Sequence, residues 1–246
     1  MGTAISLDLR PPFAGPGVVD AFFSWLVSVD DRFSTYKDAS MVSRLRRGEL
    51  SESDYDGDLR EVLDLCERVR LASAGTFDIW THSPDGVDPS GLVKGWSIDR
   101  GAEILRAGGA GNFCINAGGD VLAVGEASPG VAWRVGIRHP LEPSLVVKVV
   151  VARDLAVATS GTYERGAHIG NPVAPDTPAE LLSLMVVGPE LTLADAYATA
   201  GFAMGRAGTS WVASQDGYGV CAVTDEGRTV WDDTFGAFIA APVEAR

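Results

Sequence analysis

The distribution of apolar and polar residues along the chain first predicts one strand and two helices. Residues 3–9 alternate between apolar and polar side chains, as in a strand with one buried face. Apolar residues recur at helical spacing over 17–31 and again over 58–74. The second of these segments has Asp58 followed by Glu61 three residues later, which resembles a capping box at the start of a helix.

Farther along the chain, two more helices and a series of short strands are predicted. Ser97 as an N-cap and Gly108 as a stop favour a helix over 97–107, and a further helix is predicted near 193–204. The other apolar runs are short and are separated by Gly and Pro. They predict strands at 113–117, 120–124, 133–137, 145–151, 155–159, 183–187, 210–213 and 219–224.

The order of these elements favours one fold class. Helices cluster early and strands then follow one another in runs, instead of alternating with helices. This order is typical of an α+β protein with a largely antiparallel sheet, and not of a doubly wound parallel sheet. No internal repeat or low-complexity linker divides the chain, so residues 1–246 are predicted to form a single domain.

Composition and charge restrict the partners of this domain. The 246 residues are 46% hydrophobic and 22% charged, which is ordinary for a globular protein and excludes a disordered chain. The formal net charge is −13. Nucleic acids and anionic membrane surfaces are therefore not expected as partners, because both need a basic footprint. The charge says nothing about a small anionic ligand.

Membrane insertion, secretion and disulfide bonding are not predicted either. No apolar run approaches the ~18 residues that a membrane-spanning helix needs. The N-terminal residues lack the basic and apolar regions of a signal peptide, so a cytoplasmic location is expected. The three cysteines, Cys66, Cys114 and Cys221, are far apart without C-x-x-C spacing, which favours buried free thiols.

Two glycine-containing segments could bind a ligand through their backbone. Residues 87–95 place a turn-forming carboxylate, small residues and Lys94 ahead of a helix, and loop amides with an ammonium suit a phosphate oxygen. A tight turn with a solvated lysine explains this segment more simply. Residues 116–120 read Asn-Ala-Gly-Gly-Asp and would let the backbone approach a ligand. For this motif alone, a Gly-Gly hairpin between two strands is the better explanation.

Two further positions could supply a metal ligand or a proton acceptor. Asp195 and Thr199 are four residues apart and would share one face of a helix, where a carboxylate and a hydroxyl could ligate Mg²⁺. Alternatively, Thr192 and Asp195 form a capping box, and the residues alone do not decide between the two. His168 lies in a polar loop and could act as a general base, but a lone histidine is more often a hydrogen-bonded surface residue.

Taken in order, these segments resemble the ApbE family of FAD:protein FMN transferases. The similarity runs from residue 1 to about residue 205, and several short motifs in the right order are more specific than any one of them. The motifs are Met-Gly-Thr at 1–3, Phe-Ser-Thr-Tyr at 33–36, Ala-Gly-Thr-Phe-Asp at 74–78, Asp-Pro-Ser-Gly-Leu-Val-Lys-Gly at 88–95, Asn-Ala-Gly-Gly-Asp at 116–120, Trp-Arg-Val-Gly-Ile at 133–137, Ala-Thr-Ser-Gly at 158–161 and Ala-Asp-Ala-Tyr-Ala-Thr at 194–199.

The resemblance implies a single ApbE-like, T-fold-like α+β domain with largely antiparallel sheets and packed helices. It also implies a Mg²⁺-dependent enzyme that cleaves the pyrophosphate of FAD. Such an enzyme passes FMN through a phosphoester bond to a threonine of an acceptor flavoprotein and releases AMP. The acceptor would carry a Ser/Thr-Gly-Ala-Thr-like motif.

The resemblance further implies roles for individual residues. Gly91, Asp195 and Thr199 would hold the metal, Gly91 through its backbone carbonyl. His168 would be the base, and Lys94 would help to neutralise charge on the phosphorus oxygens. The flavin and nucleotide contacts would come from Met1, Tyr36, Thr76, Phe77, Asp78, Asp88, Lys94, Asn116, Gly118, Gly119 and Ile169.

The sequence departs from the family pattern near the implied base. Val173 and Ala174 follow Pro172 where the family has Thr-Gly, and Asn171 stands where the family has Asp. Two alternatives to FMN transfer remain open. One is an FAD pyrophosphatase, because some members of the family use water as the acceptor. The other, favoured by the altered segment, is a non-catalytic flavin-binding protein.

Overall fold

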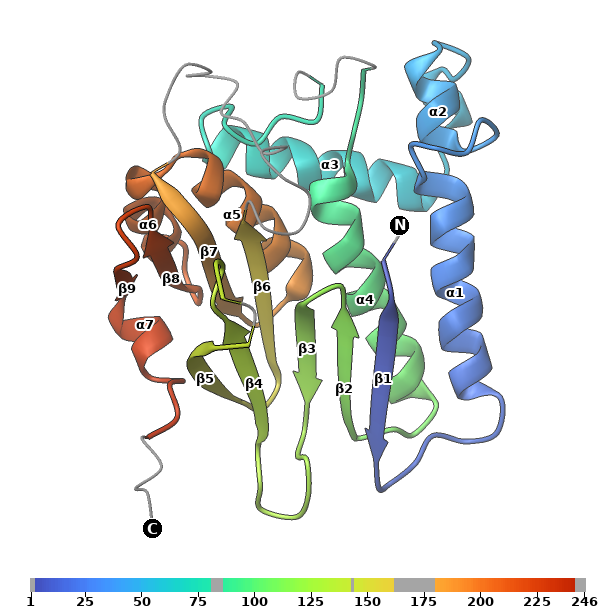
Figure 1. The fold of residues 1–246 in the computed structure, drawn as a ribbon. Coiled ribbons are helices and arrows are strands. Elements are labelled where there is room, and N and C mark those ends of the chain that lie inside the picture. The colour runs from blue at the N-terminus through green and yellow to red at the C-terminus, as the bar shows by residue number, and fades with distance from the viewer. Residues whose placement is uncertain (1–2, 81–85, 143, 162–179, 242–246) are drawn as a thin grey trace.

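A seven-stranded antiparallel sheet forms the centre of the computed structural model, which describes residues 3–80, 86–142, 144–161 and 180–241. Its first two strands come from distant parts of the sequence, because the N-terminal strand pairs with the first strand that follows the long helical region (Figure 1). In spatial order, the strands are β1 (Ile5–Arg10), β2 (Asn112–Ala117), β3 (Asp120–Val124), β6 (Leu155–Gly161), β7 (Leu181–Gly188), β8 (Gly219–Thr224) and β9 (Thr229–Trp231). The predicted α+β class with a largely antiparallel sheet is confirmed.

Helices cover one face of this sheet and a two-stranded ribbon covers the other (Figure 1). The helical layer consists of α1 (Val18–Phe33), α4 (Ser90–Ala107), α5 (Leu191–Ala203) and α6 (Arg206–Ala213). The opposite layer consists of β4 (Trp133–Arg138), β5 (Val146–Ala152) and α7 (Asp233–Gly236). Beyond the end of the sheet lie α2 (Met41–Arg46), the 3-10 turn Glu52–Asp54 and α3 (Gly57–Ala72).

Side chains of the central strands alternate between these two layers. Ile115 and Leu122 pack in the core under the helices, whereas Val121 and Ala123 pack in the core under the ribbon. All residues of β3 and β8 are buried, because both of their faces are covered. Their apolar runs are therefore continuous, as is typical of strands covered on both sides. Among the described residues, no helix has the length and apolar character needed to cross a membrane.

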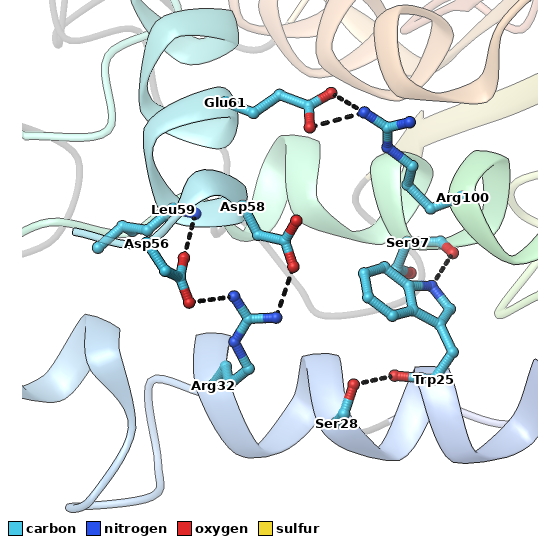
Figure 2. A network of polar contacts seen from close by, with 9 residues as sticks. All are labelled: Trp25, Ser28, Arg32, Asp56, Asp58, Leu59, Glu61, Ser97 and Arg100. Carbon is cyan, nitrogen blue, oxygen red and sulfur yellow. Dashed lines mark hydrogen bonds and ion pairs between the residues drawn. The ribbon is translucent and has the colours of Figure 1, made fainter.

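Partly buried polar contacts join α1, α3 and α4 to one another (Figure 2). The Arg32 guanidinium of α1 donates to Asp58 at 2.6 Å, and Arg100 of α4 donates to both carboxylate oxygens of Glu61 at 2.6 and 2.7 Å. The Trp25 indole of α1 donates to the backbone carbonyl of Ser97 at 2.8 Å. The position of α4 is thus fixed by two neighbouring helices, which matters because α4 carries part of the site described below.

The capping box predicted from Asp58 and Glu61 is wrong. Both side chains instead form the ion pairs just described, and α3 is capped by Asp56, whose carboxylate accepts from the Leu59 amide at 2.8 Å (Figure 2). The helix consequently begins at Gly57 and ends at Ala72, close to the predicted range of 58–74.

Two other predicted elements also differ from the structure, one in its first residue and one in its type. The helix predicted from Ser97 begins seven residues earlier, at Ser90, and the Ser97 hydroxyl donates to the Lys94 carbonyl within the helix. The first seven residues of this helix were not predicted because they include Gly91 and Gly95, and glycine has a low helix propensity. The strand predicted at 210–213 lies in α6, a short helix whose few apolar residues also fit a strand pattern.

Candidate active site

A cavity of about 270 Å³ opens at the edge of the sheet where β6 ends and α4 begins, which is the upper edge in Figure 1. Its walls combine aromatic and aliphatic side chains with a cluster of charged and hydroxyl groups. Tyr36 belongs to its lining and is 92% exposed, so its ring is available to a ligand. The lining residues are Thr3, Phe33, Ser34, Thr35, Tyr36, Phe77, Asp78, Ile79, Asp88, Ser90, Gly91, Val93, Lys94, Gly118, Thr159, Ser160, Gly161, Asp195 and Thr199.

The charged part of the site depends on the close approach of α4 to α5. The Gly95 amide of α4 donates to Oδ2 of Asp195 on α5 at 3.2 Å. A Cβ atom at Gly95 would overlap the carbonyl oxygen of Leu191 and would lie 2.7 Å from its carbonyl carbon. Only glycine allows the two backbones to be this close.

Substitution of Gly95 by alanine should therefore destabilise the protein. Alanine favours a helix by about 1 kcal/mol over glycine, but here its Cβ collides with backbone atoms that cannot rotate away, and we expect a net loss of about 2–3 kcal/mol in the free energy of unfolding. Gly57→Ala at the start of α3 is the control, because an added Cβ there would meet no other atom within 4 Å. Urea denaturation of both variants provides the measurement. Equal stability of the two variants would contradict the backbone-contact explanation.

Lys94 forms ion pairs with two buried carboxylates. Its Nζ lies 2.5 Å from Oδ2 of Asp120 and 3.4 Å from Oδ1 of Asp195. The other oxygen of Asp120 accepts from the Thr159 amide at 2.8 Å, which anchors this carboxylate to β6. The three charged groups therefore join α4, α5 and the start of β3 into one cluster.

Burial and charge shift the pKa values of this cluster in defined directions. Burial raises the pKa of Asp195 above its ordinary value, the Lys94 ammonium opposes this effect, and the nearby charge of Asp120 adds to it. Burial would lower the pKa of Lys94, but the carboxylates of Asp195 and Asp120 outweigh this effect, and the pKa is raised. Lys94 is therefore a permanent cation at neutral pH.

Hydroxyl groups lie next to this cluster. The hydroxyl oxygens of Ser160 on β6 and Thr199 on α5 are 3.5 Å apart. Gly91 is adjacent, because a Cβ there would lie 3.5 Å from Oγ1 of Thr199 and 3.3 Å from the Phe77 ring. In the part of the chain that the structure describes, no three His, Cys, Asp or Glu side chains form a group that could hold a metal ion.

The segment at 87–95 is not a loop that presents a solvated lysine. Oδ1 of Asp88 accepts from the Ser90 amide at 3.0 Å, which forms a turn at the start of α4. Arg46 supports this turn, because its Nε donates to the Val87 carbonyl at 2.7 Å. Lys94 follows in the second turn of the helix, where its ammonium forms the ion pairs with Asp120 and Asp195.

The Asn-Ala-Gly-Gly-Asp segment forms a two-residue hairpin and also lines the cavity. Gly118 and Gly119 connect β2 to β3 with φ of 62° and 101°, which glycine tolerates best. The Asn116 side chain accepts from the Gly119 amide at 2.9 Å and so stabilises the turn. Asp120 comes directly after the turn and supplies the carboxylate that holds Lys94. Sequence reasoning missed Asp120 as a site residue, although its position after the paired glycines could have indicated it.

The structure brings most of the predicted site residues together. One cavity is lined by Tyr36, Phe77, Asp78, Asp88, Gly91, Lys94, Gly118, Asp195 and Thr199. Its lining does not include Thr76, Asn116 or Gly119. Met1, His168 and Ile169 lie outside the described residues.

The alternative capping role of Asp195 is excluded. The Thr192 hydroxyl donates to Asp99 of α4 at 2.6 Å, and Asp195 accepts from Gly95 of α4 instead of capping its own helix. The carboxylate of Asp195 therefore belongs to the cavity.

Comparison with known proteins finds one family whose model matches most of this chain. The sequence model that describes the ApbE family matches residues 1–84 and 81–222 of this chain. Relatives named FAD:protein FMN transferase include proteins from three organisms. The Vibrio cholerae protein is 30% identical over 130 residues, which are 49% of this chain and 39% of that protein. The Treponema pallidum protein is 34% identical over 158 residues, or 56% of this chain and 40% of that protein. The Escherichia coli protein is 27% identical over 168 residues, or 63% of this chain and 48% of that protein. The chain therefore matches less than half the length of each of these relatives.

Solved structures show the same fold over nearly the whole chain. The flavin transferase ApbE from Vibrio cholerae superimposes with a TM-score of 0.82 at 23% identity, over 97% of this chain and 96% of that one. The ApbE protein from Thermotoga maritima superimposes with a TM-score of 0.86 at 20% identity, over 98% of this chain and 97% of that one.

Proposed function

The chain belongs to the ApbE family, and we propose that it is a Mg²⁺-dependent FAD:protein FMN transferase. In this reaction a threonine hydroxyl of an acceptor flavoprotein attacks the FMN phosphorus of FAD. A phosphoester bond to the threonine forms, the pyrophosphate bond breaks, and AMP leaves. The acceptor gains the mass of FMN less one water, and the hydroxyl proton is transferred to a base.

The main support for this proposal is that aromatic side chains and a cluster of charged side chains line the same cavity. Phe33, Phe77 and the exposed Tyr36 supply aromatic surface against which a flat flavin ring could stack. Lys94 and Asp195 supply charge at the same cavity, where a pyrophosphate would need it. FAD carries both chemical features in one molecule.

The ionic cluster needs additional positive charge before it can accept a pyrophosphate. One ammonium, from Lys94, stands against two carboxylates, from Asp120 and Asp195, so the cluster carries one excess negative charge when Asp195 is ionised. An anionic substrate would be repelled by this excess. A bound divalent cation would reverse the sign and would favour the ionised form of Asp195.

The oxygen atoms at the site fit Mg²⁺. The Asp195 carboxylate, the Thr199 hydroxyl and the Gly91 carbonyl would hold the ion, and all three are the hard donors that it prefers. Mg²⁺ commonly uses one or two carboxylates together with substrate phosphates, so a cluster of three acidic residues is not required. When bound, the ion would stabilise the negative charge that develops on the phosphorus oxygens.

The remaining roles follow from the side chains. Lys94 would hold a phosphate oxygen of FAD and orient the scissile bond while it stays protonated. His168 would take the proton of the acceptor hydroxyl. Met1 and Ile169 would contact the nucleotide, and the acceptor would carry the Ser/Thr-Gly-Ala-Thr-like motif implied by the resemblance.

Product analysis tests the proposed function. The protein is incubated with FAD and Mg²⁺, with and without an acceptor protein that carries the motif, and AMP and FMN are separated by chromatography. We expect AMP release that requires the acceptor and that stops when EDTA removes the metal. AMP together with free FMN in the absence of acceptor would indicate a pyrophosphatase. FAD that stays intact under both conditions would contradict the proposal and favour a non-catalytic flavin-binding protein.

A further inference from the structure

Asp99, which lies on α4 outside the lining of the cavity, caps the N-terminus of α5 from a different helix. Its Oδ1 accepts from the Leu191 amide at 3.1 Å, and its Oδ2 accepts from the Thr192 amide at 2.8 Å and from the Thr192 hydroxyl at 2.6 Å. The first amides of a helix have no partner within it and need such an acceptor. Glu190, the N-cap residue of α5, makes no capping hydrogen bond with its own side chain within the described part of the chain.

This cap is one of the contacts that join α4 to the start of α5. Another lies one turn earlier on α4, where Gly95 contacts the Leu191 backbone and its amide donates to Asp195. Both contacts involve backbone atoms of α5, so a shift of the start of that helix relative to α4 would disturb both of them. Asp195 lies only one turn after the capped residues, and its position therefore follows the position of the helix start.

We propose that Asp99 is a positioning residue that fixes Asp195 relative to Lys94 by capping α5 from α4. The carboxylate of Asp99 satisfies three donors at once, which offsets the cost of its burial. Without this carboxylate, the first turn of α5 has two unpaired amides and can fray, and Asp195 can move away from Lys94 and from the Gly95 amide. The same movement would separate Asp195 and Thr199 from Gly91 and so disturb the metal site of the proposed function.

The variant Asp99→Ala tests this role. Its control is Asp232→Ala, which also removes a helix cap but lies far from α4 and α5. Asp232 caps α7 on the opposite face of the sheet, where its Oδ1 accepts from the Phe235 amide at 2.8 Å and from the Val220 amide at 3.0 Å. Both variants lose a carboxylate that holds two amides. Only Asp99 is connected to the α4–α5 pair, so a difference between the variants reports on positioning and not on general stability.

The first readout is the affinity for Mg²⁺ alone, measured by calorimetry on the complete protein without FAD. Outer contacts that orient metal ligands typically change affinity by 10- to 100-fold when lost. We expect Asp99→Ala to weaken Mg²⁺ binding about tenfold, Asp99→Asn to weaken it less because one acceptor remains, and Asp232→Ala to bind as the wild type does. This readout rests on the proposed function, because it requires the wild-type protein to bind Mg²⁺.

The second readout does not depend on a metal. Amide hydrogen exchange at Gly95 reports the contact between its N–H and Asp195, and we expect faster exchange in Asp99→Ala than in Asp232→Ala. This result, with no Mg²⁺ binding by the wild type, would support the positioning role and contradict only the metal in the proposed function. Wild-type Mg²⁺ affinity in Asp99→Ala, or Gly95 exchange equal to that of Asp232→Ala, would overturn the positioning role.

Discussion

Asp195→Asn should lower the rate of AMP release at saturating FAD by roughly 100-fold or more. The substitution keeps the size of the side chain and an oxygen that can still accept from the Gly95 amide, so the contact between α4 and α5 is retained. It removes the negative charge that would hold the divalent cation. The fold should therefore remain intact while the metal-dependent reaction is lost.

The measurement is the rate of AMP release as a function of Mg²⁺ concentration. Asp225→Asn provides the control, because Asp225 is an exposed carboxylate that pairs with Arg206 away from the cavity, and this variant should retain the wild-type rate. Circular dichroism of both variants checks the fold. A wild-type rate with wild-type Mg²⁺ dependence in Asp195→Asn would rule out this residue as the metal ligand.

Lys94→Met should reduce both stability and activity. The ammonium is removed from between Asp120 and Asp195, which leaves two buried carboxylates without a cation. Breaking a buried ion pair in this way costs about 3–5 kcal/mol, and we expect a loss near the lower end because Lys94 is partly exposed. Turnover should fall by roughly 100-fold, because the charge directed at the phosphate oxygens is lost.

A second substitution separates the two effects of Lys94→Met. Adding Asp120→Asn removes one of the unpaired carboxylates, so the double variant should recover most of the lost stability but none of the lost turnover. Lys148→Met is the control, because Lys148 lies over the Trp231 ring at 4.1 Å and away from the cavity. Recovery of turnover together with stability would show that Lys94 has only a structural role.

Periodicity was sufficient to predict most of the sheet and the helices α1 and α3. The strands at 113–117, 120–124 and 219–224 lie close to the observed β2, β3 and β8, because each is a short apolar run that ends at glycine or a polar turn. The start of α4 could not be predicted, since its glycines weaken the helix signal and serve a contact with α5 that only the fold creates. The short elements α2, β9 and α7 carry too few residues for a periodic signal.

The candidate site was predictable where its chemistry follows from local motifs. Asp195 and Thr199 could be identified as a pair because helical spacing places them on one face, and the structure places both at the cavity. The partner of Lys94 could not be identified, because Asp120 lies 26 residues away and meets it only after the hairpin packs on α4. The same holds for Asp99, whose acceptor role depends on amides more than 90 residues away.

The mass of the acceptor protein after reaction tests the transferase assignment most directly. The acceptor is incubated with FAD, Mg²⁺ and this protein, and its intact mass and labelled peptide are then measured. We expect an increase equal to FMN less one water, located on the threonine of the motif. This increase should be absent when that threonine is replaced by valine, when EDTA is present, or when Asp195→Asn replaces the wild-type protein. An unchanged acceptor mass, with wild-type protein that is folded and has bound FAD, would contradict the transferase assignment.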